Sequence, residues 1–338
     1  MSSFEQTIKQ AVEDRVVPPV VLIAGDKEGK LNYRQSHGTL GLDRDNAGRP
    51  IGPESVLTWM SLTKLPTVIA VLQLVRRGAL PSLDDADADR FAHPLLFEPG
   101  TGWSYGPGLD WAGLLLERVV GTSLDAYLRE HVWAPLGLRG DAAVPTFFPA
   151  PGDGGNSNVV GTCARNPETG RVEAGPPPPP SPGQQQQQQQ GACLGGGGLH
   201  GTADALARLL ASLLADDGAV LERGAAGSAA LFEPQLAGTA KDSLLEQLEH
   251  PEWITGYIPP NGGEYNWALG GLVVEGDSLV AGRRRGFLMW GGMYNSSWFI
   301  DREAGLYGVY ATQTLPPGDD KVRDMTKAFQ EEMYSRLG

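Results

Sequence analysis

The tetrapeptide Ser61-Leu62-Thr63-Lys64 precedes an apolar run, Leu65-Pro66-Thr67-Val68-Ile69-Ala70-Val71-Leu72. Apolar residues recur there with helical spacing at Leu65, Val68, Ile69, Leu72 and Val75. Ser61 and Lys64 would then share one face, one turn apart, at a buried helix N-terminus. Pro66 is tolerated in the first turn of such a helix. Free N–H groups and the helix dipole would stabilise negative charge beside the serine.

This pairing of a hydroxyl with an amine predicts nucleophilic chemistry. A serine hydroxyl attacks well only when a base takes its proton. A lysine amine can be that base when burial disfavours its ammonium form. A capping serine followed by a surface lysine gives the same pattern, so the motif needs support elsewhere in the chain. The five histidines, His37, His93, His131, His200 and His250, are scattered along the chain, which gives no support to a Ser-His-Asp site.

The composition excludes several classes of protein. The net charge of −13 over 338 residues disfavours nucleic acid and anionic membranes as partners. The one basic cluster, Arg283-Arg284-Arg285, is expected in a solvated turn between strands. Cys163 and Cys193 are too few for a disulfide scaffold or a metal site. No signal-like leader and no membrane-length apolar run is present, so the expected location is cytoplasmic.

Strand signals occur at both ends of the chain and helical signals mainly between them. The strand patterns cover Val20–Ala24, Leu31–Arg34, Trp267–Val274, Gly286–Trp290, Ser296–Ile300 and Leu306–Thr312. The helical patterns cover 3–16 and 110–130, a segment starting near Ala203, and a segment from about Asp319. These patterns predict an α+β fold: one antiparallel sheet from both chain ends, flanked by helices, with a helical lobe inserted.

The predicted organisation is a single domain over 1–338. Its sheet lobe would come from about 1–60 and 265–338, and its helical lobe from about 61–264. Within the helical lobe, residues 150–192 are poor in apolar side chains and carry five prolines at 176–180 and seven glutamines at 184–190. Such low-complexity sequence predicts a disordered surface insertion.

A second candidate motif is Trp103-Ser104-Tyr105-Gly106-Pro107, just before a predicted helix. A phenol close to a lysine ammonium can ionise, act as a base and later return the proton to a leaving group. A tyrosine at an interface, with its hydroxyl hydrogen-bonded, is the structural alternative.

The third motif is Trp290-Gly291-Gly292-Met293, at the end of an apolar strand. Two glycines allow a ligand to approach the backbone closely. Backbone N–H groups of Ser61 and Met293 could then form an oxyanion hole. A tight hairpin that needs glycine is the alternative.

These three motifs, in this order, resemble the serine β-lactamase and penicillin-recognising family, in particular its class C-like branch of esterases and acyltransferases. Within that branch the chain is most similar to the fungal transesterases of statin biosynthesis, which share Trp-x-Tyr-Gly followed by Leu-Asp-Trp-Ala-Gly. Gly196-Gly197-Gly198-Leu199 also matches the glycine-rich entry to the branch's last helical segment.

The resemblance implies a β-lactamase/transpeptidase-like fold and specific roles for the motif residues. Ser61 would be the nucleophile, and Lys64 and Tyr105 would share the base role. Trp290, Gly291, Gly292 and Met293 would bind the oxyanion and the substrate. No metal or cofactor is implied. The expected partners are a small-molecule ester or thioester acyl donor, with an acyl-carrier protein as one such donor, and an alcohol acceptor.

Two departures from the family pattern bear on the reaction. Pro107 stands where the family's Tyr-x-Asn motif has its asparagine, which favours an ester-handling enzyme over an amide hydrolase. Only 40 residues separate Lys64 from Tyr105, roughly half the usual spacing, so part of the helical lobe is missing. We interpret the chain as a serine esterase or transesterase of secondary, polyketide-type metabolism. A β-lactamase or D-amino-acid peptidase, and an impaired descendant that acts as a binding protein, are the alternatives.

Overall fold

The computed structural model describes residues 3–79, 95–140, 144–149, 158–176, 193–224, 227–250, 254–259, 264–276 and 282–337. Its helices are α1 (Ser3–Glu13), α2 (Lys64–Arg76), α3 (Gly108–Val120), α4 (Leu124–Leu128), α6 (Ala203–Ala215), α7 (Gly238–Leu248) and α8 (Asp320–Ser335), with short helical turns η1 (Met60–Thr63), η2 (Arg129–Trp133) and η3 (Ser228–Leu231). Its strands are β1 (Val20–Asp26), β2 (Asn32–His37), β3 (Val56–Thr58), β4 (Cys163–Arg165), β5 (Val172–Ala174), β6 (His200–Thr202), β7 (Tyr265–Ala268), β8 (Gly271–Val274), β9 (Leu288–Gly291), β10 (Ser297–Asp301), β11 (Leu306–Ala311) and β12 (Thr314–Leu315).

The main sheet has seven strands in the order β2-β1-β11-β10-β9-β8-β7, and every neighbouring pair is antiparallel. Its centre joins the two ends of the chain, because Val21 of β1 lies opposite Ala311 of β11. The side chains of β1 from Val20 to Ala24 are all buried, as a central strand covered on both faces requires. The predicted antiparallel sheet from both chain ends is therefore confirmed.

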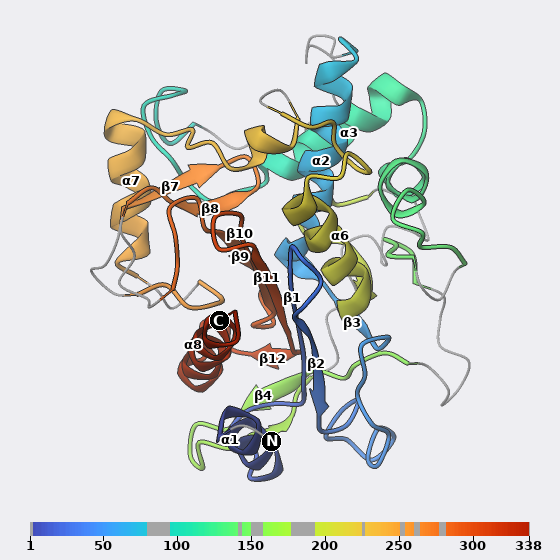
Figure 1. Ribbon diagram of the computed structural model, residues 1–338, viewed down its shortest axis with the longest axis vertical. Helices are drawn as coiled ribbons and strands as arrows, with labels where there is room; N and C mark the ends of the chain where they lie inside the picture. Colours follow the sequence, from blue (N-terminus) through green and yellow to red (C-terminus); the bar gives the residue numbers. More distant parts are fainter. Residues whose placement is uncertain are drawn as a thin grey trace.

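Helices cover both faces of this sheet (Figure 1). On one side α6 packs against β1, β10 and β11, and on the other α8 packs against β11 and α1. Helices α6 and α8 each begin at a capping side chain. Thr202 accepts from Ala205 N–H, and Asp319 accepts from Val322 N–H. The leucines of α6 are all buried, and Val322, Phe329 and Met333 form a buried stripe on α8.

Helix α2 is surrounded by protein along most of its length. It packs against α3 and α4, and eight of its residues are buried. The predicted inward position of Val75 is wrong: its side chain is 49% exposed and Leu74 is buried instead. Residues 75–78 at the C-terminal end of the helix are all exposed, so an apolar residue there can face solvent without breaking the core.

Two predicted elements are split in the structure. The helix expected over 110–130 ends at Gly121, which takes a left-handed φ of 71°, and Ser123 then caps α4. The strand expected over Trp267–Val274 is a hairpin, because β7 and β8 pair with each other across a turn at 269–270. In both places a continuous apolar pattern conceals a turn that glycine permits.

The expected solvated position of Arg283-Arg284-Arg285 is wrong for its first residue. Arg283 is only 4% exposed and donates to Tyr257 O at 2.6 Å and to Gln330 Oε1 at 2.5 Å. Its guanidinium lies 4.3 Å from the centroid of the Phe287 ring. A planar cation that can stack on aromatic rings is more easily buried than an ammonium would be.

The expected disorder of 150–192 is wrong for residues 158–176. Strands β4 and β5 pair there, and β12 extends β4 in parallel. Val172 and Cys163 are buried, and both carboxylate oxygens of Asp319 accept from the Arg165 guanidinium, one of them at 2.7 Å. A few buried side chains and one well-placed ion pair therefore order this segment. The Pro/Gln tract at 177–190 lies outside the described residues.

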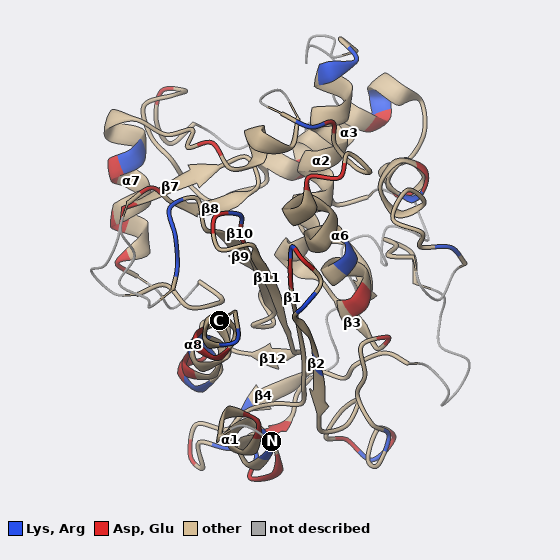
Figure 2. Cartoon of the chain, viewed as in Figure 1, with Lys and Arg blue, Asp and Glu red and all other residues tan. Residues whose placement is uncertain are grey.

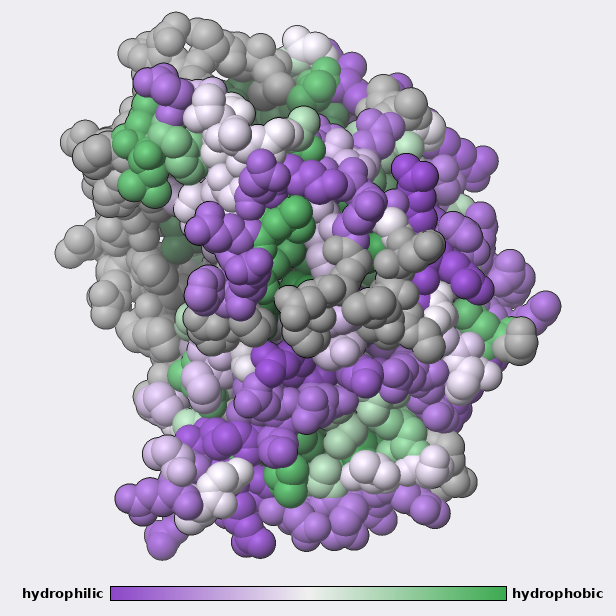
Figure 3. Space-filling model, turned by 90° about the vertical axis from the view of Figure 1, so that its left-hand side faces the viewer, coloured by the Kyte–Doolittle hydropathy of each residue, from purple (hydrophilic) through white to green (hydrophobic). Residues whose placement is uncertain are grey.

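Charged residues lie mainly in loops and on helices, and acidic positions are interspersed with basic ones (Figure 2). The face viewed in Figure 3 shows apolar surface as separate patches among hydrophilic residues. Within the described residues, no helix is both long and apolar enough to cross a membrane. The division into a sheet lobe over 1–60 and 265–338 and a helical lobe over 61–264 stays a prediction.

Candidate active site

The nucleophile motif lies in a tight turn between β3 and α2. Ser61 is half-buried in η1, one turn before α2 begins at Lys64, so it precedes the helix instead of heading it as expected. Met60, the residue before it, has a positive φ of 48°, which is uncommon for a side chain of this size. Trp59 N–H donates to Leu199 O at 2.9 Å and ties the turn to the neighbouring strand pair. This turn directs the serine away from the buried Leu62 and Thr63.

Three of the predicted site residues meet at the Ser61 hydroxyl. Lys64 Nζ lies 3.2 Å from Ser61 Oγ, and Tyr105 OH donates to the same oxygen at 2.8 Å. Lys64 also donates to Gly196 O at 2.6 Å and lies 4.8 Å from the centroid of the Tyr105 ring. A nucleophile within hydrogen-bond reach of two groups that can carry a proton is the arrangement that acid–base assistance needs.

Trp290 lies against Tyr105. Its indole N–H donates to the Tyr105 oxygen at 3.2 Å, and the two ring centroids are 5.3 Å apart. The indole N–H therefore helps to hold the Tyr105 hydroxyl in place beside Ser61. Trp290 is 6% exposed, which keeps this hydrogen bond largely away from water.

Two further tryptophans extend an aromatic wall, which we define as Trp103, Tyr105, Trp267 and Trp290. Trp267 packs edge-on against Trp290 at 4.6 Å and lies 5.1 Å from Trp103. Strand β8 lies between the strands that carry Trp267 and Trp290. Its first residue is Gly271, and a Cβ on that glycine would lie 3.4 Å from the Cβ of Trp290. Sequence reasoning missed Trp103 and Trp267 as site residues. Their separation in the chain hid them, although Trp103 stands two residues before Tyr105 in the same motif.

The glycine pair places the end of β9 directly beside the nucleophile turn. A Cβ on Gly292 would lie 2.5 Å from Trp59 O, and one on Gly291 would overlap the Thr255 hydroxyl. Neither glycine has a positive φ; in this turn Asn295 takes that conformation. The segment is a tight turn between β9 and β10, and glycine is required in it for the close approach of two backbones and not for its dihedral freedom.

Met293 follows this glycine pair and is 36% exposed. Gly292 N–H donates to Ser296 O at 2.8 Å, so that amide is engaged within the turn. The neighbouring backbone amides of Met293 and Ser61 lie on segments that the Gly292–Trp59 contact brings together. The structure thus brings all three predicted motifs to one place.

Other clusters of polar groups lack this chemistry. Within the described ranges no group of His, Cys, Asp and Glu side chains could hold a metal ion. Cys163 and Cys193 are buried and free, and burial raises the pKa of the Cys163 thiol to about 12, which makes it a poor nucleophile.

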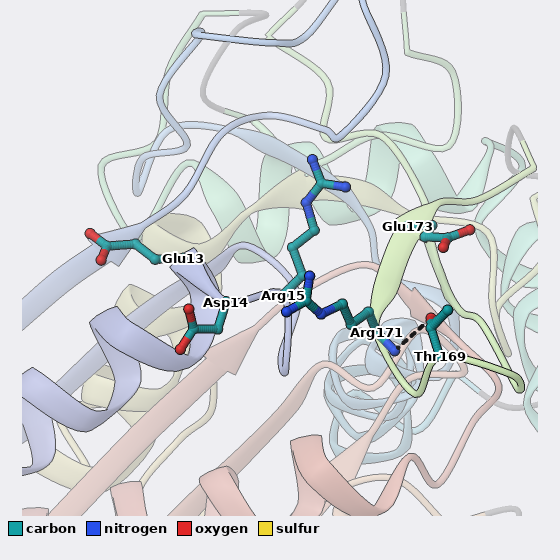
Figure 4. Close-up of a pocket in the computed structure, with 6 residues that line it drawn as sticks. All are labelled: Glu13, Asp14, Arg15, Thr169, Arg171 and Glu173. Atoms are coloured by element: carbon teal, nitrogen blue, oxygen red, sulfur yellow. Dashed lines mark hydrogen bonds between the residues drawn. The ribbon is translucent and has the colours of Figure 1, made fainter.

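A pocket of about 360 Å³ between the end of α1 and the β4–β5 hairpin is lined by Glu13, Asp14, Arg15, Thr169, Arg171 and Glu173 (Figure 4). Its charged residues are exposed and of mixed sign, and it shares no residue with the Ser61 site.

The fold and the Ser61 site define a class, the serine hydrolases and acyltransferases with a β-lactamase-like fold. A match to the Beta-lactamase family over residues 80–332 covers most of the chain, which therefore belongs to this family. The predicted family and its α+β fold are confirmed. The matched stretch contains Tyr105 and Trp290 and begins after Lys64.

Relatives within the family carry out acyl transfer and ester hydrolysis. The chain is 32% identical to acyltransferase calJ of Penicillium decumbens, over 85% of this chain and 67% of that protein. It is 33% identical to a lovastatin esterase of Penicillium rubens, over 73% of this chain and 60% of the esterase. It is 27% identical to the monacolin J acid methylbutanoyltransferase of Aspergillus terreus, over 98% of this chain and 95% of the transferase.

Solved structures agree with this placement. The LovD6 mutant of simvastatin synthase from Aspergillus terreus superimposes with a TM-score of 0.86 at 26% identity, over 99% of this chain and 94% of that one. The hydrolase EstCE1 shares the fold, with a TM-score of 0.71 at 20% identity. The alignment with the methylbutanoyltransferase is 408 positions long, so this relative carries segments that the 338-residue chain lacks.

Proposed function

We propose that the chain transfers acyl groups through a covalent Ser61 intermediate, from an ester or thioester to an alcohol or to water. The observation that carries the proposal is the convergence of Lys64 Nζ and Tyr105 OH on Ser61 Oγ, at 3.2 Å and 2.8 Å. The acyltransferase and esterase relatives support the same reaction.

In the first half-reaction, Ser61 Oγ bonds to the acyl carbon while its proton passes to the Lys64–Tyr105 pair. The bond from the acyl carbon to the leaving alkoxide or thiolate then breaks, and the pair returns the proton to that leaving group. Backbone N–H groups of Ser61 and Met293 would hold the negative oxygen of the tetrahedral intermediate. In the second half-reaction an alcohol or water repeats these steps in reverse and frees Ser61.

The aromatic wall suggests the kind of substrate. Trp103, Trp267 and Trp290 offer flat apolar surface beside the nucleophile, which favours a bulky apolar acyl group or alcohol over a charged one. The named relatives include a transferase that acts on monacolin J acid and an esterase of lovastatin, so we infer a substrate of polyketide type. A thioester on an acyl-carrier protein is one candidate donor.

Active-site labelling tests the proposal. A fluorophosphonate should add one label per chain, and peptide mapping should place it on Ser61, while Ser61→Ala should take up none. Ser104→Ala is the matched control, because its serine lies beside the same site and should leave labelling intact. Labelling that persists in Ser61→Ala would disprove the assignment, and no labelling of the wild type would favour a binding protein instead.

Product analysis separates transfer from hydrolysis. With a short-chain acyl thioester and increasing concentrations of an apolar alcohol, the ester product should rise at the expense of free acid. Free acid as the sole product at every alcohol concentration would leave an esterase. Turnover of a chromogenic cephalosporin at a comparable rate would favour the amide-hydrolase alternative.

A further inference from the structure

The glycine-rich loop at 195–197 is held between the first turns of α2 and α3. Thr67 Oγ1 of α2 donates to Gly195 O at 2.8 Å. The Asp110 carboxylate, in the first turn of α3, accepts from Gly196 N–H at 2.9 Å. The carbonyl of the same Gly196 accepts from Lys64 Nζ at 2.6 Å. One residue of the loop therefore connects Asp110 to Lys64.

At Gly195 and Gly196 the loop lies too close to α3 for a side chain. A Cβ on Gly196 would lie 2.7 Å from Asp110 Oδ2, and one on Gly195 would overlap Leu109 O. Close contact and the two hydrogen bonds together fix the direction of the Gly196 carbonyl. Because Asp110 is half-buried, its hydrogen bond to the loop is partly shielded from water.

Position 107 explains why Lys64 needs this partner. Pro107 has no side-chain amide that could hold an amine. In this chain the Gly196 carbonyl is instead the second oxygen on Lys64, besides Ser61 Oγ. If the Gly196 carbonyl could rotate, it would also accept from Lys64 in orientations that draw Nζ away from Ser61.

We propose that Asp110 is a positioning residue for acyl transfer: it fixes the Gly196 peptide so that the carbonyl holds the Lys64 amine at Ser61. The inference rests on the proposed function and adds to it a residue that touches neither substrate nor nucleophile. Tyr105 and Asp110 lie on either side of the same turn into α3, so this one turn places both the phenol and the lysine.

The test compares Asp110→Ala, Asp110→Leu and Asp110→Asn in the full chain. Alanine and leucine both remove the acceptor, and leucine keeps a similar shape. Asparagine keeps an oxygen that can accept from Gly196 N–H. Asp320→Ala removes an acidic residue from the first turn of α8, remote from Ser61, and is the matched control. The rate of p-nitrophenyl acetate hydrolysis is divided by the amount of protein that fluorophosphonate labels in a parallel sample. Unfolded protein then does not lower the rate.

Asp110→Ala and Asp110→Leu should lower kcat about 10-fold or more with little change in KM, because a hydrogen bond to a charged acceptor is lost. Asp110→Asn should stay within about 3-fold of wild type, and formate should restore part of the rate to Asp110→Ala. Equal losses in the asparagine and alanine variants, or full activity in Asp110→Ala, would overturn the inference while leaving Ser61 labelling and the proposed function standing. Absence of Ser61 labelling in the wild type would instead remove the proposed function.

Discussion

Tyr105 takes part in two hydrogen bonds through one oxygen, since it donates to Ser61 Oγ and accepts from Trp290 Nε1. The phenol oxygen therefore connects the tryptophan to the serine. Tyr105→Phe should lower kcat by about 100-fold or more, the scale of positioned proton transfer. Trp290→Phe should cost about 10-fold, since one hydrogen bond is lost.

A double-mutant cycle checks this dependence. In Tyr105→Phe, the further change Trp290→Phe should have almost no effect on kcat, because the oxygen that connects the two residues is already gone. The kcat values for p-nitrophenyl acetate of the wild type, the two single variants and the double variant give the coupling free energy between Tyr105 and Trp290. Independent, multiplicative losses would mean that Trp290 contributes mainly by contacting substrate.

Gly292 has no room for a methyl group. A Cβ there would lie 2.5 Å from Trp59 O, so Gly292→Ala must push β9 away from the nucleophile turn. The variant should lose about 1–3 kcal/mol of stability by overpacking and label Ser61 at least about 10-fold more slowly. Thermal unfolding and labelling rates measure the two effects. Gly108→Ala is the control, because nothing lies within 4 Å of a Cβ at that position.

At the scale of elements, the β4–β5 hairpin depends on one ion pair. The Asp319 side chain is 2% exposed and its partner Arg165 17% exposed, and Asp319 also caps α8. Arg165→Leu would leave the buried carboxylate without its cation and should cost about 3 kcal/mol or more of unfolding free energy in a denaturant titration. Arg171→Leu removes an exposed arginine from the same hairpin and should change stability by less than about 0.5 kcal/mol. Equal small effects would show that the pair does not hold the hairpin.

The elements that the sequence predicted well have complete local signals. Helix α8 has a capping aspartate and a buried stripe, and the end strands have uninterrupted apolar runs. The β4–β5 hairpin was missed because its order comes from residues far along the chain, Thr314 and Asp319. The burial of Arg283 was missed for the same reason, since Gln330 and Phe287 lie on other elements.

In the candidate site, too, the residues with a local motif could be predicted and those placed by contacts between distant segments could not. Ser61, Lys64 and Tyr105 were found because each lies in a recognisable motif. Gly196 and Asp110 were not assigned a role, since a backbone carbonyl leaves no trace in residue identity and its direction depends on contacts between two helices. Trp267 meets Trp290 only after the sheet has formed.

For the whole molecule, a buried histidine predicts how stability depends on pH. Burial lowers the pKa of His200 below its ordinary value of 6.5, although a hydrogen bond with the Gly198 backbone acts in the opposite direction. The unfolded chain therefore binds this proton more readily than the folded chain. His200 thus leaves stability intact above pH 6.5 and diminishes it progressively as pH falls through the range below 6.5.

Urea titrations between pH 7 and 5 measure this dependence. The wild-type free energy of unfolding should fall toward pH 5, and His200→Gln should reduce that slope by up to about 1.4 kcal/mol per pH unit. Burial also lowers the pKa of His37, so a residual slope of the same sign should remain. An unchanged slope in His200→Gln would show that another group titrates in this window.

The pairing of β1 with β11 also governs when the protein can fold during its synthesis. Val21 is synthesised long before its partner Ala311, and Phe4 must likewise wait for Phe329. Until then the β1–β2 hairpin has an open edge of unpaired N–H and C=O groups. The nascent chain is therefore exposed to aggregation until β11 has been made, and a message cut short before β11 would yield a chain with Ser61 and Lys64 but without the strand that joins β1 to β10.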